Sequence, residues 1–227
     1  MNTQVHMKPN KKRILCFGDS LTWGFEPVNH LRFDEEDRWP QVMQHILGET
    51  YVVIEEGQCG RTIATDDPAE GEKNGLLYLQ PCLESHKPFD LLCVMLGSND
   101  CKRKFSYSAS DIAGEMQRFL QKVIMFRQFN SPCDFEILLI APPLITNDIK
   151  GKWLEESFDV NHAPAVSKGL ARYYRGLAQS LGCRFINAAE YVQVSPVDGC
   201  HLDADGQREL GRVIAAYVEE HCFSVQV

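Results

Sequence analysis

A serine lies in the turn that follows the first apolar run of the chain. The turn Gly18-Asp19-Ser20-Leu21-Thr22 comes after residues 13–17, whose composition predicts a β-strand. A serine in such a turn can present its hydroxyl group while its own backbone N–H faces a ligand. The pattern lacks the second glycine of the Gly-x-Ser-x-Gly nucleophile elbow. A turn that only caps a helix explains these residue types equally well, because Asp and Ser favour such positions.

A histidine near the other end of the chain supplies the base that a serine nucleophile requires. The serine hydroxyl is a poor nucleophile until an imidazole removes its proton, and a carboxylate must hold that imidazole in orientation. Asp198-Gly199-Cys200-His201 offers both groups on one loop before the last predicted helix. Alone, this pattern also fits a loop aspartate beside an exposed histidine. We assign the other histidines to the surface or the core: His6, His30, His45, His86, His162 and His221.

Two further strand ends carry groups that can stabilise an oxyanion. Gly60 follows the second predicted strand, and the absence of a Cβ lets its N–H approach a substrate closely. Asn99, in Gly97-Ser98-Asn99-Asp100 after the third strand, has a side-chain amide that can donate to the same point. Each turn alone is ordinary loop chemistry. Together with Ser20 and His201, these groups occupy four predicted strand ends, which coincidence explains poorly.

The elements that must position these residues alternate along the chain. Strands are predicted at residues 13–17, 51–54, 89–96, 135–141 and 184–188, and helices at 40–47, 111–127, 164–181 and 204–220. Ser108 and Asp111 form a predicted capping box, and Asp203 can cap the last helix. This alternation predicts a parallel sheet with helices on both faces, whose sites gather beyond the carboxyl ends of the strands.

The 227 residues are expected to form one domain over residues 11–227 after a flexible N-terminal tail at 1–10. Residues 144–161 show no clear period and are long for a connection, so they form either a rim over the site or a subunit contact. Trp23 and Trp153 are the candidates for an aromatic wall of the substrate pocket, although core packing explains Trp23 equally well. Lys102 could line the rim of the pocket, but a solvated surface charge is the favoured expectation.

Composition excludes several partners and cofactors. The net charge of −8 disfavours nucleic acid and anionic lipid, and the apolar runs are too short for a membrane helix. The nine cysteines are scattered, with no C-x-x-C pair and no Cys/His cluster at zinc spacing, so we expect no metal site. Reduced cysteines and the lack of an export signal in residues 1–10 favour a cytoplasmic protein.

The four motifs together resemble the sequence blocks of the SGNH (GDSL-type) hydrolases. Gly18-Asp19-Ser20-Leu21, Gly60, Gly97-x-Asn99-Asp100 and Asp198-x-x-His201 stand in the family's order, and the resemblance runs from about residue 13 to 221. It implies a flavodoxin-like, three-layer α/β/α fold with a five-stranded parallel sheet, and a serine esterase, lipase or acyltransferase that needs no cofactor. By position, Ser20 is then the nucleophile, His201 the base and Asp198 its orienting carboxylate. Ser20 N–H, Gly60 N–H and the Asn99 amide form the oxyanion hole.

A narrower similarity points to the arylesterase-type acyltransferase (perhydrolase) subgroup. The stretches 13–24, 53–57, 61–62 and 95–100 are similar to it. This implies a homo-oligomer that acts on short-chain esters and passes the acyl group to water, alcohols or peroxide. The alternatives are a carbohydrate deacetylase with the same machinery, a non-catalytic binding protein on this fold, and, more remotely, a thiol mechanism through Cys16, Cys59 or Cys200.

Overall fold

The computed structural model describes residues 11–130 and 134–223, so the tail expected at residues 1–10 lies outside the described residues. Five parallel strands form one sheet in the order β2-β1-β3-β4-β5, which is the flavodoxin-like order. The strands are β1 (Lys12–Gly18), β2 (Tyr51–Gly57), β3 (Leu91–Met95), β4 (Glu136–Ala141) and β5 (Arg184–Asn187). The helices are α1 (Ser20–Trp23), α2 (Trp39–Leu47), α3 (Gly75–His86), α4 (Ala109–Phe129), α5 (Glu155–Phe158), α6 (Ala163–Leu181) and α7 (Ala204–His221). The predicted α/β architecture is confirmed.

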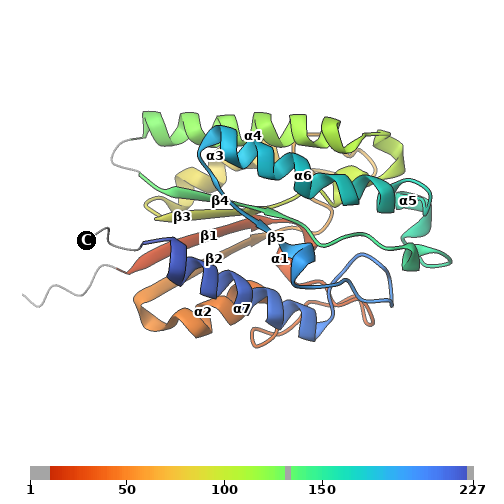
Figure 1. The fold of residues 1–227 in the computed structure, drawn as a ribbon, viewed down its shortest axis with the longest axis horizontal. Helices are drawn as coiled ribbons and strands as arrows, with labels where there is room; N and C mark the ends of the chain where they lie inside the picture. Colours follow the sequence, from red (N-terminus) through yellow and green to blue (C-terminus); the bar gives the residue numbers. More distant parts are fainter. Residues whose placement is uncertain (1–10, 131–133, 224–227) are drawn as a thin grey trace, which may run out of the picture.

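Helices cover both faces of the sheet, with α3, α4 and α6 on one side and α2 and α7 on the other (Figure 1). Successive strand residues point to opposite faces, so Leu15 and Phe17 pack in one layer while Ile14 and Cys16 pack in the other. Every residue of β3 is buried, as the continuous apolar run predicts for a strand covered on both faces.

The helix ends agree closely with the sequence pattern. Ser108 and Asp111 form the predicted capping box of α4, and the Asp203 side chain accepts a hydrogen bond from Gly206 N at 2.8 Å at the start of α7. On α6, Tyr173 is exposed, whereas Tyr174 is buried and its hydroxyl donates to Leu96 O.

No helix is predicted between the second and third strands, where the structure has α3. Pro81 lies inside this helix, Leu77 is exposed, and Asn74 caps the helix by accepting hydrogen bonds from Leu76 N and Leu77 N. A proline in the interior and an apolar residue on the outer face both obscure the helical pattern. Within the described residues, no helix is both long enough and apolar enough to cross a bilayer.

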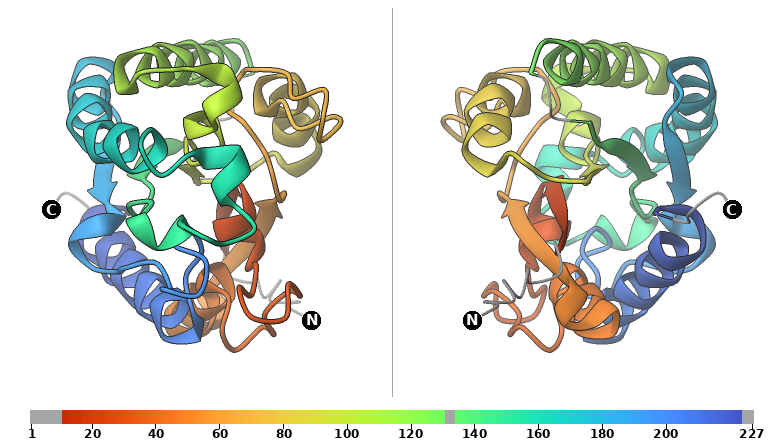
Figure 2. Two further views of the ribbon diagram at one scale, coloured as in Figure 1. Left: turned by 90° about the vertical axis from the view of Figure 1, so that its right-hand side faces the viewer. Right: turned by 90° about the vertical axis from the view of Figure 1, so that its left-hand side faces the viewer.

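The strand order creates a crevice at the carboxyl ends of β1 and β3. The chain leaves β1 toward β2 and leaves β3 toward β4, on opposite sides of the sheet, and such switch points are the usual ligand sites of open α/β sheets. Figure 2 (left) looks onto this end of the molecule, with α5 and the rest of segment 144–161 crossing in front of it.

Candidate active site

Ser20 begins the short helix α1 immediately after β1. Asp19 is the N-cap residue, and its Oδ1 accepts a hydrogen bond from Leu21 N at 3.0 Å. The turn is tight, because a Cβ on Gly18 would lie 2.0 Å from Thr22 Oγ1 and 2.9 Å from Met95 O. The helix-capping interpretation and the nucleophile interpretation are therefore compatible: the cap holds Ser20 at the carboxyl edge of the sheet, where it lines a pocket.

His201 and Asp198 lie on the loop between β5 and α7. Asp198 Oδ1 accepts hydrogen bonds from Cys200 N at 3.0 Å and His201 N at 2.9 Å, while Oδ2 lies 2.6 Å from His201 Nδ1. Gly199 makes this turn possible. Its φ is +72°, and a Cβ there would lie 2.5 Å from Ile149 N.

The two segments meet at a hydrogen bond that joins residues far apart in the chain. His201 Nε2 lies 2.9 Å from Ser20 Oγ, so hydroxyl, imidazole and carboxylate form a continuous line. Burial would raise the pKa of Asp198, but the hydrogen bond and charge of His201 and the two backbone N–H groups together lower it. The carboxylate is thus ionised and able to stabilise an imidazolium. The arrangement can activate the Ser20 hydroxyl by removing its proton.

Three potential oxyanion donors lie at the same pocket. Neither Ser20 N nor Gly60 N donates a hydrogen bond to another described residue, so both remain available to a ligand. Gly60 has a φ of +81°, which favours glycine. The Asn99 amide donates to Arg61 O at 3.2 Å and, with a longer bond of 3.4 Å, to Asp19 Oδ2. These bonds use both Nδ2 hydrogens and orient the amide beside the pocket, where the longer bond to Asp19 can be exchanged for one to an oxyanion.

The pocket around Ser20 has a volume of about 310 Å³ and one largely apolar wall. Phe25 packs on His201, with ring centroids 4.3 Å apart, and Trp153 lies nearly parallel to the imidazole at 6.4 Å. Leu154 and Phe158 of segment 144–161 complete this wall, so the segment forms a rim over the site.

Of the two predicted aromatic residues, Trp153 lines the pocket and Trp23 does not. The Trp23 ring instead lies under the Arg32 guanidinium, with 5.4 Å from Arg32 Cζ to the ring centroid. Phe25, two residues further along, takes the place at the pocket and was missed. The left-handed conformation of Gly24 ends α1 and redirects the chain, and no pattern in the sequence signals that change of direction.

Charged side chains also line the pocket, and the favoured expectation that Lys102 is a solvated surface charge is wrong. Its side chain is only 4% exposed, lines the pocket and pairs with Glu70 and with Asp67, the latter at 3.4 Å. Asp67 also pairs with Lys104, and Lys73 lines the same side of the pocket. Burial of a lysine is tolerated because both carboxylates compensate its charge.

Behind the pocket, buried polar residues hold the turns in place. Burial raises the pKa of Asp19 to about 6 and that of Asp100 to about 7, and Asp100 accepts a hydrogen bond from Ile63 N at 3.0 Å. Arg61 donates to Gly18 O at 2.8 Å and to Glu56 O, and so ties β1 to β2. Asp19, Arg61 and Asp100 thus hold the turns around the pocket.

Thiols near the site are poor candidates for the nucleophile. Burial raises the pKa of Cys59 to about 11 and that of Cys200 well above its ordinary value. Every cysteine in the described ranges is free. Across those same residues, the one group of side chains with metal-ligand spacing lies outside this pocket.

Comparison with known proteins places the chain in a family. Residues 16–209 match the model of the GDSL-like lipase/acylhydrolase family. A carbohydrate acetylesterase from Sinorhizobium meliloti is 36% identical, with a TM-score of 0.87, over 92% of this chain and 99% of that one. The M. smegmatis aryl esterase is 35% identical, with a TM-score of 0.85, over the same shares of the two chains. A comparison with curated protein sequences finds no significant match.

The chain therefore belongs to the GDSL-like lipase/acylhydrolase family, the SGNH hydrolases, as the four motifs predicted. More particularly, it is a carboxylic ester hydrolase whose solved relatives include aryl esterases and carbohydrate acetylesterases.

Proposed function

We propose that this chain is a serine esterase that hydrolyses small acetyl-type and aryl esters through Ser20, His201 and Asp198. The observation that carries the proposal is the hydrogen-bonded line from Ser20 Oγ through His201 to Asp198, at a pocket of about 310 Å³. A pocket of this size suits a short acyl group with a compact alcohol, and is small for a long lipid chain.

In the first half-reaction, Ser20 Oγ attacks the ester carbonyl while His201 Nε2 takes the serine proton. The resulting oxyanion accepts hydrogen bonds from Ser20 N–H, Gly60 N–H and the Asn99 amide, and Asp198 stabilises the imidazolium. His201 then gives its proton to the leaving alcohol as the carbon–oxygen bond breaks. In the second half-reaction, water loses a proton to His201 and attacks the acyl-enzyme, which releases the acid and restores Ser20.

Transfer to alcohols or peroxide is part of the proposal, because an acyl-enzyme accepts any nucleophile that reaches it. Phe25, Trp153 and Phe158 form an apolar surface that excludes bulk water from one side of the pocket. The product ratio in water with added alcohol measures this partition directly.

A carbohydrate acetylesterase is the second candidate, and the mixed pocket favours it. Trp153 offers an aromatic face, and Glu70, Lys73 and Lys102 offer charged hydrogen-bonding groups in the same pocket. Acetate release from acetylated oligosaccharides, compared with p-nitrophenyl acetate, distinguishes the two candidates through the ratio of their kcat/KM values.

The proposed setting is cytoplasmic, and the proposed assembly is a homo-oligomer. Free cysteines throughout the described residues support a reducing compartment. Exposed apolar residues, Val28 and Leu31 on one loop and Val197 on another, support self-association. Sedimentation of the purified chain measures the assembly.

The test of the proposed chemistry is the Ser20→Ala variant. It is expected to lose hydrolysis of p-nitrophenyl acetate by a factor of about 10³ or more while its circular dichroism is unchanged. Ser180→Ala, at an exposed serine of α6, is the matched control and should keep full activity. A serine-directed phosphonate should label the wild-type chain once, at Ser20. Retained turnover in Ser20→Ala would refute the assignment.

A further inference from the structure

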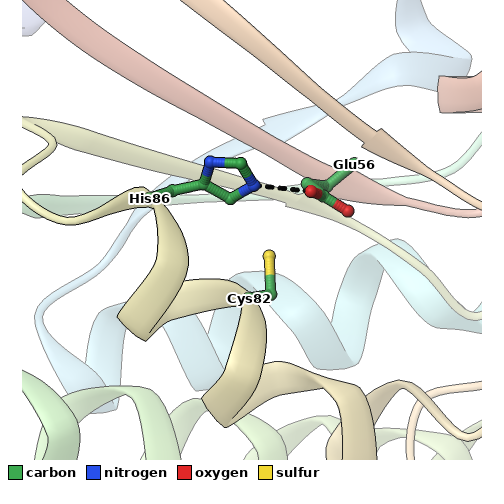
Figure 3. A group of neighbouring side chains, drawn as sticks. All are labelled: Glu56, Cys82 and His86. Atoms are coloured by element: carbon green, nitrogen blue, oxygen red, sulfur yellow. Dashed lines mark hydrogen bonds and ion pairs between the residues drawn. The ribbon is translucent and has the colours of Figure 1, made fainter.

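A second cluster of chemically active side chains lies between β2 and α3, outside the pocket around Ser20. Glu56 belongs to β2, while Cys82 and His86 stand four residues apart on α3 and therefore share one face of that helix. Their ligand atoms all lie within 4.8 Å of one another. Figure 3 shows the three side chains pointing toward a common point.

Glu56 and His86 interact with each other, whereas the sulfur of Cys82 has no hydrogen-bond partner among the described residues. His86 Nε2 lies 2.6 Å from Glu56 Oε1, and the Tyr78 hydroxyl donates to Glu56 Oε2 at 3.1 Å. Cys82 is only 1% exposed, and its thiol is free and makes no hydrogen bond to a described residue. In Figure 3 its sulfur points toward the space beside the paired imidazole and carboxylate. A buried thiol aimed at two further donor atoms is the arrangement expected of a ligand set.

We propose that Glu56, Cys82 and His86 bind a zinc ion between β2 and α3. The thiolate, imidazole and carboxylate set matches the ligands that Zn²⁺ takes in proteins, whereas Mg²⁺ and Ca²⁺ prefer oxygen alone. Three protein ligands leave the fourth tetrahedral position to water. Access is available, since the side chains of His86 and Glu56 are 24% and 18% exposed.

The local charges are compatible with a divalent cation. A thiolate and a carboxylate together neutralise Zn²⁺, and the imidazole adds no charge. The nearby cation is Arg61, whose guanidinium lies over the Tyr78 ring at 5.2 Å and donates to the backbone carbonyl of Glu56. Burial raises the pKa of Cys82 to about 12, so its thiol is neutral without metal and releases its proton to solvent on binding.

Because the cluster lies between two elements and outside the pocket around Ser20, the expected role of the ion is to link those elements. A zinc ion would join α3 to the edge strand β2, and Tyr78 would orient the Glu56 carboxylate as an outer partner. Because Arg61 links Glu56 O to Gly18 O, the site supports the strand that leads into Ser20 from behind. Zinc binding by this cluster is independent of the proposed esterase mechanism.

The test is a titration of the metal-stripped full chain, kept reduced, with Co²⁺ as the probe. One equivalent is expected to produce a thiolate-to-cobalt absorption band that Zn²⁺ abolishes by displacement. Groups such as His201 and Asp198 produce no such band, because they lack sulfur. Zinc should also raise the melting temperature of the wild-type chain.

Substitutions test whether the thiolate-to-cobalt band arises from Glu56, Cys82 and His86. Cys82→Ser should abolish it, and His86→Gln should weaken Co²⁺ binding at least tenfold, whereas the matched variants Cys183→Ser and His45→Gln should leave it unchanged. His86 is partly exposed, so His86→Gln decides the question even if Cys82→Ser fails to fold. Absence of the band, its persistence in Cys82→Ser, or equal binding by His86→Gln and His45→Gln would each overturn the proposal.

Discussion

Two clusters in this molecule contain the same three kinds of group: a potential nucleophile, an imidazole and a carboxylate. In Ser20, His201 and Asp198, the imidazole bridges the other two at 2.9 and 2.6 Å, and the cluster opens into a pocket. In Cys82, His86 and Glu56, the imidazole contacts the carboxylate, but the sulfur is buried and makes no hydrogen bond to a described residue. Alignment and access, rather than residue type, separate a cluster suited to acyl transfer from one suited to ligation.

The surroundings of the two carboxylates reinforce this contrast. Asp198 accepts two backbone N–H groups besides the imidazole, so its orientation is fixed within one tight loop. Glu56 is held by side chains from α3, namely the Tyr78 hydroxyl and the His86 ring. A loop that positions its own histidine can maintain a precise line to Ser20, whereas a pair divided between a strand and a helix is better suited to fastening those elements together.

The largest expected effect is that of His201→Ala. Without the imidazole, Ser20 has no base, and kcat/KM for p-nitrophenyl acetate should fall by about 10³-fold or more. His45→Ala, on the exposed face of α2, should stay within about twofold of the wild type. Comparable activity of the two variants would show that His201 contributes no more to the reaction than a surface histidine does.

A smaller loss is expected for Asp198→Asn. The amide keeps the shape of the loop but cannot stabilise the imidazolium, so kcat should fall by about 10²- to 10³-fold. Asp203→Asn is the matched control, because Asn caps a helix as well as Asp does. Steady-state kinetics of both variants measure the difference, and an unchanged kcat in Asp198→Asn would show that the carboxylate has no part in the reaction.

The sequence predicts the residues of the first cluster but not those of the second. Ser20, His201 and Asp198 were all predicted, because each follows a strand whose apolar pattern is clear and because Asp198 and His201 are close in sequence. The cluster of Glu56, Cys82 and His86 was not. The predicted second strand stops at Ile54, whereas β2 continues to Gly57 with its two glutamates paired to side chains, and α3 was missed altogether.

The failed prediction for Lys102 and the missed pocket residue Phe25 have a common cause, because both depend on the tertiary structure. The burial of Lys102 depends on Asp67 and Glu70, which are more than thirty residues away in the chain. Phe25 reaches the pocket only because Gly24 turns the chain after α1. The alternation of strands and helices, by contrast, is a local signal, and all five strands and the helices α2, α4, α6 and α7 were predicted close to their observed bounds.

Substitution of Trp153 should have a moderate effect on substrate binding, because only the Ser20 cluster opens into a pocket. Trp153→Ala removes part of the apolar wall, so KM for aryl esters should rise about three- to tenfold while kcat changes less. Tyr191→Ala removes an equally exposed aromatic ring that does not line the pocket and should leave KM unchanged. Equal effects on KM would mean that the wall contributes nothing specific to binding.

The smallest effect concerns stability and the buried carboxyl of Asp100. Its pKa is raised to about 7 by burial, so between about pH 4 and 7 the unfolded chain loses this proton while the folded chain keeps it. The contribution of Asp100 to the free energy of unfolding therefore decreases as pH rises through that range. Asn at this position retains an acceptor for Ile63 N without the charge.

Denaturant titrations of Asp100→Asn and the wild type at several pH values measure this contribution. Relative to the wild type, the variant should gain stability as the pH rises from 4 to 7, by about 1 to 3 kcal/mol. A difference that is constant across this range would show that Asp100 does not titrate as its burial implies.

The most direct test of the central claim is to trap the acyl-enzyme and locate the acyl group. Rapid acid quenching during turnover of p-nitrophenyl acetate, followed by peptide mass spectrometry, should find one acetyl group on the peptide that contains Ser20. The same experiment on Ser20→Ala should find none. An acetyl group on Cys59, Cys200 or Cys82 of the wild-type chain, together with full turnover by Ser20→Ala, would contradict the account.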